Sequence, residues 1–434
     1  MEVKVLHLSS FDLAGGAARA AYRIHEGLQA TSVSSQMLVQ FKSGDNPSVE
    51  TVENKIQARF RSSFDHLLLQ SEHRQKMFSS QWFPDAVAAK VNRRSFDIIN
   101  LHWTCNSFLQ IETLAKLKTP LVWTLHDMWA FTGGCHYSEG CDRYKNSCGQ
   151  CPLLKSNKER DLSHWVWQRK AKAWKGLNPV IVAPSVWMAK CAQSSALFSD
   201  VPIQVIPYGL NTQQYKPIDR RIARAILNLP QDKHLILFSA ISPNDPRKGF
   251  QFLNEALQKL AEDGWKDRVE LLVLGNSLSS NQLSSHFKTH SLGRLNDDIS
   301  LALIYAASDI FAAPSTEDNL PNTVMEALAC GTPCVAFCIG GMPDMIEHQQ
   351  NGYLAQPYEV EDLTKGIVWV LENQERHQKL CERARAKVEN EFTLELQTSR
   401  YASLYKQILE QKTPRIRTGG KTGKVSQAGV NLVG

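Results

Sequence analysis

PSTEDNLPNTVMEALACGTPCVAF, residues 314–337, places an acid, Asp318, eight residues before a second acid, Glu326, across a turn into a helix. A proline fits the first turn of such a helix and Asn322 can cap it, so backbone amides near Asn322 and Thr323 would be free to meet a diphosphate. Glu326 would lie about one turn further in and accept hydrogen bonds from ribose hydroxyls, while Asp318 would face a transferred sugar. This layout suits a nucleotide sugar; the alternative is an ordinary capped helix with solvated acids.

An apolar strand follows this helix, and the same alternation runs through most of the chain. Short runs rich in Val, Ile and Leu alternate with segments of helical period, which is typical of parallel sheets with crossover helices. The fold class is therefore α/β, with two doubly wound parallel sheets that would bind ligands beyond the carboxyl ends of their strands. The expected strands are 3–8, 33–39, 97–101, 121–125, 180–183 and 204–206, then 234–240, 269–274, 310–313 and 332–337.

Glycine and proline interrupt the pattern after VIPYGLNTQQYKP and mark a boundary between two domains. We expect an N-terminal domain over residues 1–212 and a C-terminal domain over residues 213–394. A last helix, residues 395–411, is expected to pack back toward the N-terminal domain. Residues 412–434 are basic, rich in Gly and poor in large apolar side chains, which predicts a disordered tail.

The bulk composition is that of a soluble globular protein with room for two cores: 434 residues, 43% hydrophobic and 21% charged. No apolar run approaches the roughly 20 residues that cross a bilayer, and the start lacks the features of a secretory signal, so we expect a cytoplasmic protein. A net charge of +6 fits anionic small ligands or an anionic membrane surface. No basic run with interleaved aromatics is present, so we expect no nucleic-acid partner.

The segment HWVWQRKAKAWKG, residues 164–176, places Trp167, Ala171 and Trp174 along one face of a helix. Such a face can touch a membrane surface, which would make the protein peripheral at the inner, cytoplasmic membrane. A stripe of this kind more often packs on the protein's own core, and we favour that interpretation.

Four of the ten cysteines, Cys135, Cys141, Cys148 and Cys151, cluster in GGCHYSEGCDRYKNSCGQCPLL. Without an export signal the cysteines are expected to be mainly reduced. Four thiolates can hold one structural zinc ion tetrahedrally, with the last two in a tight knuckle. Free buried thiols and redox pairs are the alternatives.

The start of the chain, VLHLSSFDLAGGAARAAYRIHEGL, is predicted to form a strand, a loop with Gly15 and Gly16, and a helix. Glycines allow close approach of the backbone to a ligand, and the helix start offers amides to negative charge, so the loop is a candidate wall of a cleft. A tight strand-to-helix turn gives the same pattern without a ligand. Because the G-x-G-x-x-G fingerprint is incomplete, we do not expect a dinucleotide site.

Histidines follow two strands of the first half. PLVWTL is followed by His126 and Asp127, where an imidazole can exchange a proton or a hydrogen bond near neutral pH. We therefore take His126 as a candidate catalytic residue, with a histidine bonded to its own loop as the alternative. His102 and Trp103 end the preceding strand and are candidates for an acceptor pocket, unless they form a buried amphipathic pair.

The loop PNDPRKGF carries Arg247 and Lys248 directly before a helix. Adjacent cations at a strand-to-helix turn make a good diphosphate clamp, since Arg binds bidentately and Lys adds a mobile charge. A solvated basic turn is the common alternative. Gly340 and Gly341, after the strand that ends the opening stretch, offer another close backbone approach, and Gly341 is a candidate donor-binding residue unless the pair forms a plain tight turn.

In combination these residues resemble the retaining glycosyltransferases of family 4, which have the GT-B fold of two facing Rossmann-like domains. The resemblance covers nearly all of residues 1–411. It is carried by the glycine loop, the strand-end histidine, VIPYGLN, RKG, SDIFAAPSTEDNLPNTVMEALACGTPCVAF and DMIEHQQNGYL. In that family the C-terminal domain binds the nucleoside diphosphate sugar, the N-terminal domain binds the acceptor, and the reaction takes place in the cleft between them.

The resemblance assigns roles to individual residues. Lys248 is similar to the phosphate-binding lysine, Glu326 to the glutamate that holds the ribose, and His126 to the cleft histidine near the donor sugar. Asp318 stands at the place of the first glutamate in the family's Glu-x7-Glu motif. We expect metal-independent transfer with retention, in which no cofactor is required beyond the nucleotide sugar itself.

Two departures from the family pattern matter. The family has Glu where Asp318 stands, and the neighbouring Glu317 lies nine rather than eight residues before Glu326, so either acid could face the sugar. The family's phosphate arginine precedes the lysine by several residues, where this chain has Ile241, and Arg247 is a candidate substitute.

The segment HDMWAFTGGCHY resembles a bacterial branch of the family that is associated with polysaccharide assembly. This resemblance implies a glycan or lipid-linked acceptor, in an exopolysaccharide or lipopolysaccharide context. Two alternatives remain open: a nucleotide-sugar epimerase of related fold, and a catalytically degenerate binding partner in an assembly complex.

Overall fold

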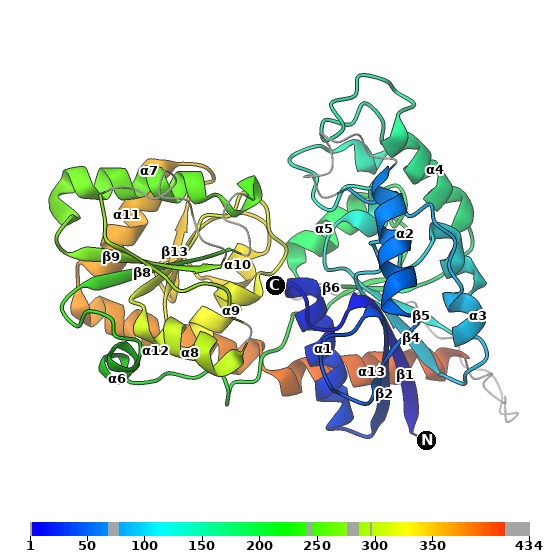
Figure 1. Ribbon diagram of the computed structural model, residues 1–434, viewed down its shortest axis with the longest axis horizontal. Coiled ribbons are helices and arrows are strands. Elements are labelled where there is room, and N and C mark those ends of the chain that lie inside the picture. The colour runs from blue at the N-terminus through cyan, green and yellow to red at the C-terminus, as the bar shows by residue number, and fades with distance from the viewer. Residues whose placement is uncertain (1, 68–77, 241–244, 276–285, 296, 413–434) are drawn as a thin grey trace, which may run out of the picture.

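The computed structural model describes residues 2–67, 78–240, 245–275, 286–295 and 297–412. Figure 1 shows two lobes side by side, each with helices packed around a sheet. Both sheets pair their described strands in parallel, which confirms the predicted α/β class. The tail predicted to be disordered, residues 412–434, lies outside the described residues except for Lys412.

The sheet of the first lobe has the order β3-β2-β1-β4-β5-β6-β7 among the described residues. Its central strands are almost wholly buried and rich in Val, Ile and Leu, as strands covered on both faces must be. The strands are β1 Val3–Phe11, β2 Val33–Phe41, β3 Val49–Thr51, β4 Ile98–Leu101, β5 Leu121–Thr124, β6 Val180–Ala183 and β7 Ile203–Val205. The helices are α1 Gly16–Gln29, α2 Lys55–Leu67, α3 Val87–Val91, α4 Leu162–Ala173 and α5 Val186–Ser194.

The second lobe has the order β10-β9-β8-β11-β12-β13 among the described residues. Its strands are β8 His234–Ala240, β9 Val269–Gly275, β10 Thr289–Ser291, β11 Ile310–Ala313, β12 Cys334–Phe337 and β13 Gly352–Ala355. Its helices are α6 Arg220–Ile226, α7 Phe250–Leu260, α8 Asp298–Ala307, α9 Asn322–Ala329, α10 Met342–Met345, α11 Val360–Leu371 and α12 Gln374–Glu391.

In each sheet the chain adds strands first on one side of its starting strand and then on the other. The switch falls between β1 and β4 in the first sheet and between β8 and β11 in the second. In doubly wound sheets a crevice opens outside the carboxyl ends of the strands at such a point. The loops that leave β1, β4, β8 and β11 are therefore the places to look for a ligand site.

The last helix, α13 (Leu394–Lys412), returns to the first lobe, where it runs along the sheet in Figure 1. The Tyr405 hydroxyl accepts a hydrogen bond from Asn100 of β4 at 2.8 Å, and the Tyr401 hydroxyl lies 2.9 Å from that of Thr124 in β5. Both tyrosines are fully buried together with Leu404 in a cluster of side chains from the first sheet. The first domain is thus completed by the end of the chain.

Helix α4 contains most of the segment considered for membrane contact. Trp174, just beyond its end, is buried in the first core, with its ring 5.2 Å from that of Trp123, and Lys170 is also buried. Of the three stripe residues, Trp174 therefore packs on the protein's own core, while Trp167 and Ala171 are half-buried. None of the described helices is long and apolar enough to cross a bilayer. Peripheral membrane contact stays a prediction.

Candidate active site

A cavity of about 400 Å³ lies between the two domains, at the loops that follow β1, β4, β5, β8 and β11. Most of the predicted site residues line it: Gly15, Gly16, Trp103 and His126 from the first domain, and Arg247, Lys248, Asp318, Asn322 and Thr323 from the second. A smaller hollow of about 140 Å³ adjoins it and includes Glu326. A larger hollow of about 920 Å³, near α6 and α12, contains none of the predicted residues, so we place the site in the crevice between the domains.

Asp318 lies in the wall of this cavity and pairs with both predicted cations. Lys248 Nζ donates to Asp318 Oδ2 at 2.6 Å, and Arg247 Nη1 lies 3.4 Å from the same oxygen. Burial alone would raise the pKa of Asp318, but the charges of Lys248 and Arg247, together with the hydrogen bonds from Lys248 and the Asn319 amide, outweigh burial and lower that pKa below its ordinary value. The carboxylate is therefore ionised at neutral pH and holds two cations at the cavity wall.

The neighbouring acid, Glu317, is instead bound to the first domain. Its carboxylate accepts a hydrogen bond from the backbone amide of Glu139 at 2.8 Å and one from the Ser138 hydroxyl at 3.2 Å. Glu317 therefore bridges the two domains, and Asp318 is the acid that lines the cavity.

Glu326 is buried and already has two partners. Arg23 of α1 donates to its Oε1 at 2.7 Å, and the Tyr305 hydroxyl lies 3.1 Å from its Oε2. The ion pair joins the two domains directly beside the predicted ribose site. Arg23 was not predicted as a site residue, although a cation in a helix of small and apolar side chains was an available signal.

The start of α9 differs in detail from the prediction. Pro321 occupies the cap position and no side chain caps the helix, so the expectation that Asn322 caps it was wrong. Asn322 Nδ2 instead donates across the crevice to the backbone oxygen of Gly16 at 3.0 Å. The first turn still lines the cavity through Asn322 and Thr323, where amides that precede the first intrahelical hydrogen bond can meet an anion.

His126 lies in the cavity wall with both ring nitrogens already bonded to protein. Its Nδ1 lies 2.7 Å from the Tyr208 hydroxyl, and its Nε2 lies 3.0 Å from His102 Nδ1. His102 is buried behind His126 rather than in the cavity lining, so it does not form the predicted wall of an acceptor pocket. Burial lowers the pKa of His126 to about 4, which keeps the ring neutral at pH 7.

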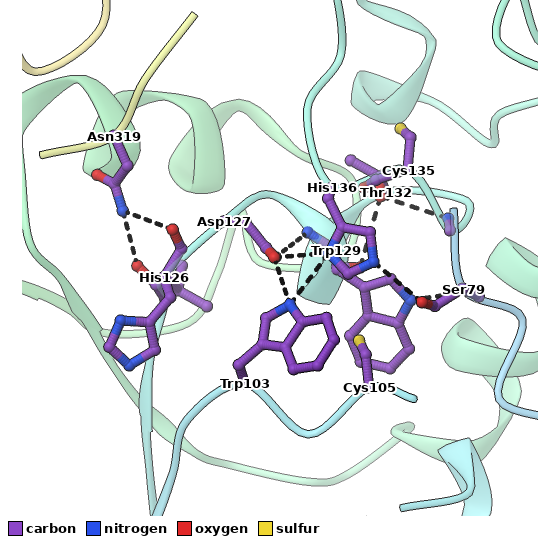
Figure 2. Close-up of polar contacts among 12 residues, drawn as sticks. Ser79, Trp103, Cys105, His126, Asp127, Trp129, Thr132, Cys135, His136 and Asn319 are labelled. Carbon is purple, nitrogen blue, oxygen red and sulfur yellow. Dashed lines mark hydrogen bonds and ion pairs between the residues drawn. The ribbon is translucent and has the colours of Figure 1, made fainter. Parts of the chain in front are cut away.

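Trp103, the other candidate for an acceptor pocket, does line the cavity, and Asp127 fixes its orientation. Figure 2 shows the Asp127 carboxylate among three donors: the Trp103 indole at 2.8 Å, His136 Nδ1 at 2.6 Å and the backbone amide of Trp129 at 2.9 Å. The figure also shows Asn319 of the second domain, whose amide donates to the backbone oxygen of His126 at 3.1 Å. This loop of the second domain thus docks on the strand end that carries His126.

Backbone conformation or close packing requires glycine at two of the predicted positions, Gly15 and Gly341. Gly15 adopts φ +91°, a conformation that other residues rarely take, in the loop that lines the cavity. A Cβ on Gly341 would lie 1.7 Å from the backbone oxygen of Asn319, so only glycine fits there. Its amide donates to the Asp318 backbone oxygen at 3.1 Å, so Gly341 supports the loop that carries Asp318.

The four clustered cysteines surround one small cavity of about 20 Å³ in the first domain. All four carry free thiols, and the backbone amide of Gly133 donates to Cys148 Sγ at 3.1 Å. Within the described part of the chain, no group of three or more metal-binding side chains is arranged to hold a metal ion. The zinc site stays a prediction.

Two protein-family models match the chain. The model described as Glycosyltransferase Family 4 matches residues 14–214, and the model described as Glycosyl transferases group 1 matches residues 219–387. Among curated proteins, the D-inositol 3-phosphate glycosyltransferase of Segniliparus rotundus is 31% identical over 185 residues, which are 40% of each chain. The matched segments span 29% to 47% of the length of the curated relatives.

Solved structures resemble the whole molecule. Sucrose-phosphate synthase from Thermosynechococcus elongatus has a TM-score of 0.68 at 17% identity, over 94% of this chain and 100% of that one. HepE of Anabaena, in complex with UDP-glucose, has a TM-score of 0.63 at 18% identity, over 93% of this chain and 99% of that one. At these identities the likeness shows the fold, and it confirms the two-domain GT-B architecture. The chain therefore carries a family 4 glycosyltransferase domain, residues 14–214, followed by a group 1 glycosyltransferase domain, residues 219–387, in the GT-B architecture.

Proposed function

We propose that this protein moves a sugar from a nucleoside diphosphate sugar to a hydroxyl of a glycan or lipid-linked acceptor, with retention, in exopolysaccharide or lipopolysaccharide synthesis. The observation that carries the proposal is the meeting of Lys248, Arg247 and Asp318 with the start of α9 in one interdomain cavity. The complex of the Anabaena neighbour with UDP-glucose supports a nucleotide sugar as the donor.

In the proposed reaction the bond between the anomeric carbon and the phosphate oxygen breaks, and the acceptor oxygen forms a bond to that carbon on the same face. The acceptor proton passes to the departing phosphate oxygen. Negative charge grows on the diphosphate as the bond breaks. Lys248, Arg247 and the first-turn amides of α9 would stabilise this charge in the transition state, and electrostatic stabilisation of this kind is usually the largest single contribution to catalysis. Asp318 would orient the sugar, and Trp103 would border the acceptor.

A screen of purified protein against UDP-, GDP-, ADP- and dTDP-sugars tests the donor proposal. A donor that binds only the folded state stabilises it by about 2.7 kcal/mol at 100 times its Kd, so one nucleotide class should raise Tm clearly above the others. Product analysis by NMR then separates the alternatives: transfer yields a glycosylated acceptor, while an epimerase releases free sugar or an epimer. Absence of any thermal shift and of any product would favour a degenerate binding partner and overturn the proposal.

We also propose that the cysteine cluster holds one structural zinc ion, because four thiols line a single small cavity and match the ligand number of a tetrahedral site, into which metal binding would draw them from their present arrangement. Protein purified without chelator is expected to contain about one zinc per chain by elemental mass spectrometry. Cys148→Ser combined with Cys151→Ser should lose the metal and lower Tm. Cys338→Ser, at an exposed cysteine in the other domain, is the matched control and should keep the metal. Zinc-free wild-type protein of unchanged stability would refute the site.

A further inference from the structure

Three buried histidines form a hydrogen-bonded row that ends at Tyr208 in the cavity wall. His7 lies in β1, and His102 and His126 follow β4 and β5, the next two strands of the sheet. His7 Nδ1 lies 2.9 Å from His102 Nε2, His102 Nδ1 lies 3.0 Å from His126 Nε2, and His126 Nδ1 lies 2.7 Å from the Tyr208 hydroxyl. Neighbouring strands thus bring together residues that are far apart in the sequence.

Each ring in the row is neutral near pH 7. Burial lowers the pKa of His126 to about 4, and burial also lowers the pKa of His7 and of His102. A neutral imidazole has one N–H donor and one acceptor nitrogen. The row therefore has three hydrogen bonds and four hydrogens: one on each ring and one on the Tyr208 hydroxyl.

Only two arrangements satisfy all three hydrogen bonds. In the outward arrangement every ring carries its hydrogen on Nδ1 and donates toward the cavity, and Tyr208 accepts from His126. The hydroxyl hydrogen of Tyr208 is then free to bond a ligand. In the inward arrangement Tyr208 donates to His126, every ring carries its hydrogen on Nε2, and the last N–H is that of His7.

The cavity end of the row favours the outward arrangement, because an ionised diphosphate only accepts hydrogen bonds and so requires a donor from the wall. At the buried end, His7 Nε2 has no hydrogen-bond partner among the described residues, so this end leaves an N–H without an acceptor in the inward arrangement and a lone pair without a donor in the outward one. Burial also raises the pKa of Tyr208 well above its ordinary value, so the hydroxyl keeps its hydrogen.

We propose that Tyr208 donates a hydrogen bond to a phosphate oxygen of the donor substrate, and that His126, His102 and His7 are positioning residues that keep its hydroxyl hydrogen directed into the cavity. This inference rests on the proposed function and adds a residue to it. It also changes the role of His126: with both nitrogens bonded within the protein, this ring has no nitrogen free to bond the sugar and acts through Tyr208.

The direction of the row can be measured without any turnover. In the full chain labelled with ¹⁵N-histidine, long-range ¹H–¹⁵N correlation spectra distinguish Nδ1–H from Nε2–H tautomers, and His102→Gln and His126→Gln variants assign the signals. We expect the Nδ1–H tautomer at His102 and His126. The Nε2–H tautomer at these two rings would overturn the inference even if the protein proves to be a transferase.

Kinetics test the contact with the substrate. Tyr208→Phe keeps the ring and removes the hydroxyl, so we expect kcat to fall by roughly 10- to 100-fold with a smaller change in the KM of the donor. Tyr401→Phe is the matched control, because that buried tyrosine bonds Thr124 away from the cavity lining, and its kcat should be unchanged. Full kcat in Tyr208→Phe would overturn the proposed contact. If the wild-type chain transfers no sugar, the proposed function fails, and the tautomers still decide the direction of the row.

Discussion

Lys248→Met is expected to lower kcat/KM for sugar transfer by about 10²–10³, because it removes a cation from the place where charge develops on the diphosphate. Methionine keeps an unbranched side chain of similar length, so the loss can be assigned to the charge. Steady-state kinetics with the donor identified by the thermal screen measures the effect.

The matched control for this variant is Lys259→Met. Lys259 lies on α7 and forms a surface pair with Glu361 at 2.9 Å, with 42% of its side chain exposed. Lys259 does not line the cavity and its exposed pair contributes little to stability, so Lys259→Met should leave kcat/KM unchanged. Equal kcat/KM in the two variants would mean that Lys248 only balances Asp318 and does not bind the diphosphate.

Glu326→Ala is expected to cause two separate losses. Removing the carboxylate leaves Arg23 buried without its partner, which should lower the free energy of unfolding by about 3–5 kcal/mol. Donor binding should also weaken strongly, because the ribose loses its proposed acceptor. Chemical denaturation measures the first loss and calorimetric titration of the donor measures the second.

A double variant separates these two losses. In Arg23→Met combined with Glu326→Leu, two apolar side chains replace the buried ion pair, and such replacements are commonly neutral or stabilising. Most of the stability should therefore return, while donor binding should stay weak. The single variant Arg23→Met is the companion control, since it keeps the carboxylate. Normal donor affinity in the double variant would show that Glu326 holds the domains together and does not bind ribose.

The sequence predicted the buried strands well and missed three of the four edge strands, since β7 was expected at residues 204–206. The three strands it missed, β3, β10 and β13, all lie at the edge of a sheet. An edge strand pairs on one side only, and β3 and β10 have three residues each, with a single buried side chain in β3 and none in β10. Such strands lack the continuous apolar run that identifies a strand covered on both faces.

The sequence predicted the site residues that lie in loops directly after strands. It did not predict the contacts that are made between the two domains. Lys248 and Asp318 lie in loops after strands, and the carboxyl ends of parallel strands converge at one edge of a sheet. The pairing of Arg23 with Glu326 joins residues 303 positions apart, and no local pattern encodes which helix of one domain faces a given helix of the other. Asn322 illustrates the same limit, because a residue expected to cap its own helix instead bonds a loop of the other domain.

The return of α13 to the first sheet has a consequence for biosynthesis. The side chains of Tyr401 and Tyr405 fill a cluster that also contains Val5, Ile98 and Val122, so this face of the amino-terminal half is covered only in part, by Ile24 and Leu28 of α1, until the ribosome has made nearly the whole described chain. The core of the second lobe consists mainly of residues that follow the linker between the lobes. This lobe can therefore fold while one face of the first sheet is still incompletely covered. A nascent chain stalled before α13 would present that incompletely covered apolar face to chaperones and proteases.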